Sequence, residues 1–144
     1  MSGLIGQLDE LVLAREVGPG WTVATALCHL AFWDQRALFY LHDWERSGRV
    51  EMQPFNSQSV EGINQAVNAI AHKVPRRAAV KLVLESAAAV DSHLERISDQ
   101  LVEQIRTAGM ERYLKRSLHR REHAERIRAA LGNAQNLDSG EPAE

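Results

Sequence analysis

The chain has 144 residues, a formal net charge of -2 and a hydrophobic fraction of 44%, which predicts one globular domain and is too short for two. The mixed charges give no strong basic field for nucleic acid or an anionic membrane, and no run of about 18 apolar residues predicts a transmembrane helix. A lone cysteine, Cys28, cannot form an internal disulfide, and the sequence opens without a leader pattern, so we expect a cytoplasmic protein.

The first predicted helix covers residues 2–16, where Leu8, Leu11 and Leu13 are among the apolar contacts. The run Val17-Gly18-Pro19-Gly20 should end it, because glycine and proline both oppose helix continuation.

The second predicted helix covers residues 22–48 and has the clearest pattern in the chain. Thr22 is a plausible N-cap and Gly48 a plausible C-terminal stop. Its apolar residues recur at steps of three and four, the period of a helix that buries one face; they are Ala26, Leu30, Trp33, Ala37, Leu41 and Trp44.

Two further long helices are predicted, over residues 75–98 and 110–131, with Pro75 opening one and Gly132 ending the other. A short helix at 60–73 and a linking turn at 101–105 complete the ordered part, and no strand alternation of useful length occurs. Residues 133–144 are polar and rich in helix breakers, which predicts a disordered tail. The pattern therefore favours an all-α, four-helix bundle over residues 1–132.

His119 and His123 form an H-x-x-x-H pair in the last predicted helix. Residues four apart lie on the same helical face, so two such imidazoles can bind one metal ion. Ile127 continues this face, which points the pair toward the interior of the bundle. The alternative is a solvated pair on a charged segment, and the adjoining Arg120 and Arg121 favour that reading.

His29 lies on the apolar stripe of the second predicted helix. A single histidine there is more often a packed core residue than a ligand. Helix bundles, however, build metal sites from inward side chains of facing helices. His29, His119 and His123 would together form a three-histidine set with positions left open for water or substrate.

Two neighbours of His29 are candidate pocket residues. Trp33, one turn away, could form a pocket wall. Arg36, two turns away, could bind an acidic substrate, although a surface arginine is the plainer reading. The remaining histidines are expected at the surface; they are His42, His72 and His93.

Several segments resemble the DinB-like superfamily, and in particular the branch that includes the N-terminal domains of mycothiol-dependent maleylpyruvate isomerases. Gly20-Trp21-Thr22 followed by the run from Cys28 to Asp34 resembles its second helix, and the run from His119 to Ile127 its last helix. Pro54-Phe55-Asn56 and Ile63-Asn64 resemble the segment between helices two and three. Thr25 stands where an acid is common, so no capping box is expected.

The resemblance covers most of residues 21–131 and implies a four-helix bundle with zinc or nickel on His29, His119 and His123. It also implies a small-molecule substrate, in some relatives with a low-molecular-weight thiol as co-substrate. Three functions stay open: a thiol-dependent transferase or isomerase acting on a small electrophile, a metal-dependent hydrolase, and a non-enzymatic metal-binding bundle. Leu114 and Leu118 lie off the histidine face, which predicts a homodimer.

Overall fold

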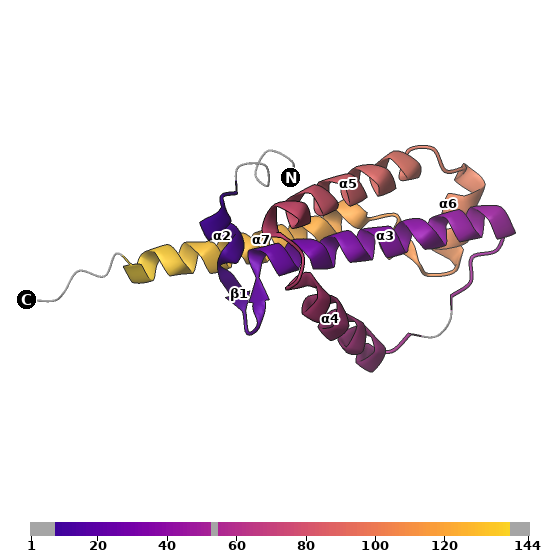
Figure 1. Cartoon of the computed structure of the whole chain (residues 1–144). Coiled ribbons are helices and arrows are strands. Elements are labelled where there is room, and N and C mark those ends of the chain that lie inside the picture. Colours follow the sequence, from indigo (N-terminus) through magenta and orange to yellow (C-terminus); the bar gives the residue numbers. More distant parts are fainter. Residues whose placement is uncertain (1–7, 53–54, 139–144) are drawn as a thin grey trace, which may run out of the picture.

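A computed structural model describes residues 8–52 and 55–138, and beyond residue 132 only the backbone. The described residues are mostly helical, which confirms the all-α class (Figure 1). None of the described helices is long and apolar enough to cross a membrane. The elements in chain order are α2 Glu10–Ala14, β1 Glu16–Gly18, β2 Trp21–Thr22, α3 Val23–Ser47, α4 Ser57–Ala71, α5 Arg76–Leu94, α6 Asp99–Thr107, the 3-10 helix η1 Glu111–Tyr113 and α7 Arg116–Asp138.

Helix α3 is the long central element, and both of its ends are fixed by local chemistry. The Thr22 hydroxyl accepts from the Thr25 backbone N–H at 3.2 Å, and the Thr25 hydroxyl accepts from the Thr22 N–H at 2.9 Å. The expectation of a missing capping box is therefore wrong, because a hydroxyl at Thr25 serves as well as a carboxylate. At the other end, Gly48 adopts φ 69°, the left-handed conformation that glycine adopts without steric cost.

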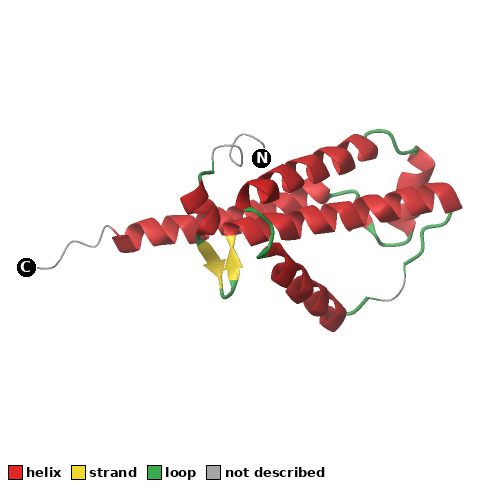
Figure 2. Ribbon diagram, viewed as in Figure 1, coloured by secondary structure: helices red, strands yellow, loops and turns green. Residues whose placement is uncertain are grey.

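The other helices are arranged around α3. Helix α5 lies along it in the most extensive contact of the structure, while α4 packs on it and then diverges from its axis (Figures 1 and 2). Helix α7 contacts α3, α5 and strand β1. Apolar side chains form two clusters along α3, one around Leu27 and Leu30 near its start and one around Leu41 and Trp44 near its end.

The N-terminal part differs from the predicted helix. Residues 2–7 lie outside the described part, and the helix that is described, α2, has only five residues. Leu13 is fully buried, whereas Leu11 is 81% exposed and makes no core contribution. The chain then turns through Gly20, at φ 75°, to form a short antiparallel pair, β1 and β2 (Figure 2). This hairpin was not expected, because its two strands are too short to show alternation.

The C-terminal part also corrects three predicted boundaries. The expected turn at 101–105 is helix α6, capped by Ser98, with Leu101 and Ile105 buried one turn apart. The last helix begins at Arg116, after η1, and it runs through Gly132 to Asp138. A glycine inside a helix costs about 1 kcal/mol relative to alanine but does not by itself end the helix. The tail predicted to be disordered covers residues 133–144; residues 133–138 are helical instead, and residues 139–144 lie outside the described part.

Candidate metal centre and adjoining cavity

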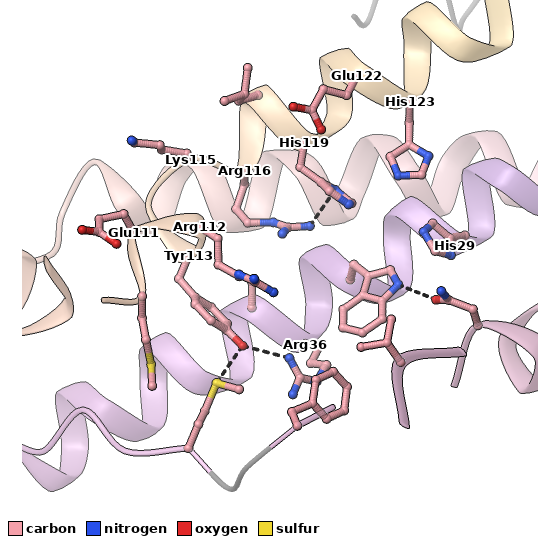
Figure 3. Close-up of a pocket in the computed structure, with 18 of the residues that line it drawn as sticks. His29, Arg36, Glu111, Arg112, Tyr113, Lys115, Arg116, His119, Glu122 and His123 are labelled. Carbon is pink, nitrogen blue, oxygen red and sulfur yellow. Dashed lines mark hydrogen bonds between the residues drawn. The ribbon is translucent and has the colours of Figure 1, made fainter. Parts of the chain in front are cut away.

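The structure brings the three predicted histidines together. His29 lies in the second turn of α3, and His119 and His123 lie one turn apart on the facing side of α7 (Figure 3). Each offers one ring nitrogen, and these three nitrogens all lie within 4.8 Å of one another. Two nitrogens bound to one zinc ion are at most about 4 Å apart, so small side-chain adjustments suffice for one ion to reach all three.

Aromatic packing holds His29 in place. Its ring lies edge-on to Trp21 at a centroid distance of 5.4 Å and to Trp33 at 6.2 Å. The His29 side chain is 8% exposed, and its buried Nδ1 has no hydrogen-bond partner among the described residues. An unsatisfied buried nitrogen costs about 1–3 kcal/mol. A metal ion at this nitrogen, or at a ring turned to present it, would remove that cost.

The three imidazoles are neutral at physiological pH, as metal ligands must be. Burial, with help from His123, lowers the pKa of His29 to about 4. Burial and the Arg116 guanidinium lower the pKa of His119 to about 3. Burial also lowers the pKa of His123. Loss of water around the rings is the largest cause in each case, since desolvation disfavours the charged imidazolium.

A buried ionic network that the sequence reading missed lies beside the histidines. Asp34 of α3 is fully buried and accepts from Arg116 Nε at 2.9 Å and from Arg120 at 2.7 Å. Arg120 also binds both carboxylate oxygens of Asp91 on α5. Arg116 and Arg120 are only 6% and 4% exposed. The network therefore ties α7 to α3 and α5, at the level where the two apolar clusters of α3 meet.

Arg116 also contacts a candidate ligand directly. Its terminal nitrogen lies 3.1 Å from His119 Nδ1, and because a guanidinium can only donate, Nδ1 must accept (Figure 3). A neutral imidazole has one nitrogen lone pair for this purpose. If an ion binds Nδ1, it replaces Arg116; if it binds Nε2, the proton moves to Nδ1 and faces the donor. Metal binding and the Arg116 contact therefore exclude each other.

A cavity of about 860 Å³ opens next to the three histidines. Both predicted pocket residues line it, and Arg36 is not a plain surface arginine. Its guanidinium lies 5.2 Å from the ring centroid of Trp33, 4.8 Å from Tyr40 and 4.6 Å from Phe55. It also donates to the Tyr113 hydroxyl at 2.9 Å.

Among the charged side chains of the cavity lining, basic residues outnumber acidic ones. Two acidic side chains, Glu111 and Glu122, face five basic ones in the lining; the basic residues are Arg36, Arg112, Lys115, Arg116 and Arg126. Beside His29, Trp33 Nε1 donates to Asn64 Oδ1 of α4 at 3.1 Å. This bond fixes the indole, so its ring gives the cavity an apolar surface next to the histidines.

The other three histidines differ in their exposure to solvent. His42 and His72 are exposed, as expected, although His72 Nε2 lies 3.0 Å from the Gly20 carbonyl oxygen. His93 was expected on a solvated face, but it is 8% exposed. Its acidic and polar sequence neighbours suggested solvent, whereas its own side chain faces α3.

The site could be read only in part from the sequence. The helical period placed His29 on a buried face, and the four-residue spacing paired His119 with His123. The same spacing links Arg116 to Arg120, and Asp34 falls between Leu30 and Ala37 on the apolar stripe. A carboxylate in such a stripe was the available signal for the ionic network.

Comparisons of the chain with protein-family models, with curated protein sequences and with solved structures gave no match.

Proposed function

We propose that this chain is a four-helix bundle of the DinB-like type that uses one divalent metal ion to act on a small, negatively charged molecule. The observation that carries the proposal is the convergence of three neutral imidazoles, from two separate helices, at the wall of a large cavity. The resemblance of the segments around His29 and His119 to that superfamily supports the same reading.

The donor set fits a borderline metal ion. Imidazole nitrogens suit zinc and nickel, and a set of three protein ligands leaves a position open, as in catalytic rather than structural zinc sites. The buried Nδ1 of His29 has no hydrogen-bond partner among the described residues, which is consistent with a nitrogen that binds a metal ion. When bound, such an ion lowers the pKa of a water or thiol at the open position and so supplies a nucleophile near neutral pH.

The chain's own residues would bind and orient the substrate. The cavity volume is in the range typical for small-molecule sites. Arg36 is stacked among three rings and bonded to Tyr113, so it is held in place with little freedom to lose on binding. It can therefore pair with a carboxylate or phosphate group while Trp33 excludes water from the side next to His29.

Two reactions are compatible with this arrangement. In the first, a low-molecular-weight thiol is the co-substrate and the protein is a transferase or isomerase that acts on an electrophile. In the second, water is the nucleophile and the protein is a hydrolase. The basic side chains of the cavity favour an anionic substrate in both reactions, so substrate charge does not separate them. The two reactions differ in their need for a thiol, and turnover measured with and without added thiol distinguishes them.

The experiment that tests the proposal is metal analysis of untagged protein, with His123→Ala compared against His72→Ala. His72 is an exposed histidine outside the site, so the two variants lose the same side chain. We expect His123→Ala to hold one zinc or nickel ion per chain fewer than wild type, and His72→Ala to match wild type. Equal metal content in all three proteins would overturn the metal centre and favour the non-enzymatic alternative.

A further inference from the structure

A second group of metal-ligating side chains lies far from the first. His42 and Glu45 on α3 and His93 on α5 each offer one ligand atom, and these atoms all lie within 4.8 Å of one another. The two imidazole centroids are 4.2 Å apart, and Glu45 Oε2 is 3.3 Å from His93 Nε2. His42 follows His29 by thirteen residues, which is about 20 Å along a helix. No single ion could serve both groups.

The helical geometry explains why these three residues meet. His42 and Glu45 are three residues apart and so share one face of α3. Helix α5 packs along α3, and His93 in its last turn faces this interface. His93 is 8% exposed, whereas His42 and Glu45 are exposed. The group therefore lies at the solvent edge of the interface, where an ion could enter.

The plainer explanation is an ion pair between Glu45 and His93, whose N···O distance of 3.3 Å is within range for one. The two groups are not, however, aligned for a hydrogen bond. The buried Nε2 of His93 forms no hydrogen bond within the described residues, although Glu45 is close. An ion pair with Glu45 also leaves unexplained why a second imidazole, His42, packs against the first. Two imidazole nitrogens and a carboxylate oxygen within 4.8 Å of one another are a recognised donor set for divalent transition metals.

We propose that His42, Glu45 and His93 form a second site for a divalent first-row transition metal, such as zinc, that links the distal ends of α3 and α5. Solvent completes the coordination, because two of the three ligands are exposed. The site lies outside the large cavity, and none of its residues lines that cavity. Its role is to stabilise the helix pair, and it does not depend on the function proposed above.

Zinc titration of chelator-treated full-length protein tests the second site, with zinc itself as the probe. His42→Ala is the informative variant, because His42 is exposed and its loss should not impair folding. Whatever the first site binds, we expect His42→Ala to bind one zinc ion per chain fewer than wild type. His72→Ala should bind as much as wild type. An unchanged stoichiometry in His42→Ala would overturn the proposal.

The double variant His42→Ala/His123→Ala distinguishes the two sites. The His123→Ala single variant should still bind one zinc ion and gain thermal stability from it, because an ion that binds only the folded state raises the melting temperature. The double variant should bind none and show no such gain. If His42→Ala loses an ion while His123→Ala does not, the second site stands and the proposed function fails; the reverse result supports only the first site. In the His123→Ala background, which isolates the second site, a Glu45→Gln change that leaves zinc binding equally tight would also refute that site, since glutamine is a poor metal ligand compared with a carboxylate.

Discussion

Asp34→Asn is expected to destabilise the protein severely, because it removes the one negative charge that two buried arginines share. Asp34 is fully buried, and Arg116 and Arg120 are 6% and 4% exposed. Arg120 keeps Asp91 as a partner, but Arg116 loses its only carboxylate within the described residues. Removing one partner of a buried ion pair typically costs about 3–5 kcal/mol. Asparagine can still accept one hydrogen bond, so we expect the lower end, about 3 kcal/mol.

This loss is large compared with the whole stability of a domain, which is about 5–15 kcal/mol. It corresponds to a fall of about 10 °C in melting temperature for a chain of this size. The measurement is urea denaturation and thermal unfolding in the presence of a chelator, so that bound metal does not contribute.

Asp43→Asn is the matched control for this prediction. Asp43 also lies on α3, and it pairs with Arg46, whose side chain is 82% exposed. Solvent-exposed pairs contribute about 0–1 kcal/mol, so this variant should unfold close to wild type. A difference of about 0.5 kcal/mol or less between the free energies of unfolding of Asp34→Asn and Asp43→Asn would be typical of neutral surface changes. That result would mean that the buried network is not what holds α7 to α3.

Four further predictions follow from the same contacts. Chelator-treated protein should lose stability as the pH falls from 6.5 toward 4, because burial lowers the pKa of His29 to about 4 while the unfolded chain takes up the proton near 6.5. The free energy of unfolding should fall by about 1.4 kcal/mol per pH unit for each such histidine. A His29→Gln variant with an equally steep pH profile would contradict this account. Arg116→Gln should bind zinc more tightly than wild type, since Arg116 competes with the ion for His119. The metal-free variant should be less stable than metal-free wild type, because the bond from Arg116 to Asp34 is lost. Weaker zinc binding by calorimetry would argue against the competition. Gly48→Ala should cost about 1 kcal/mol at chemical denaturation, because φ is 69° while no atom crowds the added Cβ; a neutral result would mean that the helix end shifts. We also predict a homodimer. Leu118, which is 45% exposed, still supports it, whereas Leu114 packs against the apolar cluster around Leu41 and Trp44. A molar mass by light scattering equal to that of one chain, 16.1 kDa, would refute the prediction.

The sequence by itself determined the helical class, the extent of α3 and the pairing of His119 with His123. These features depend on local rules: the period of apolar residues, the preference of threonine for an N-cap and of glycine for a left-handed helix end, and the position of residues four apart on one face. The helix ends that depend on packing were not readable. Gly132 predicts a helix end, although the helix continues to Asp138. The segment of α6 resembles a turn in sequence, because its two buried residues span a single helical step.

On α5 and α7, only the tertiary structure decided which polar and charged side chains are buried. Arg120 and Arg121 are adjacent in a charged segment, yet Arg120 is buried by Asp34 and Asp91 while Arg121 faces solvent. His93 is likewise surrounded in sequence by polar residues, and it becomes buried because α5 turns that face toward α3. Burial of a charged or polar group depends on partners from other helices. The partners of Arg120 lie far away in the sequence: Asp91 is 29 positions away and Asp34 is 86 positions away. The period of a helix can place a polar residue on the buried face, as it does for His29 and Asp34, but it does not identify the partner on another helix.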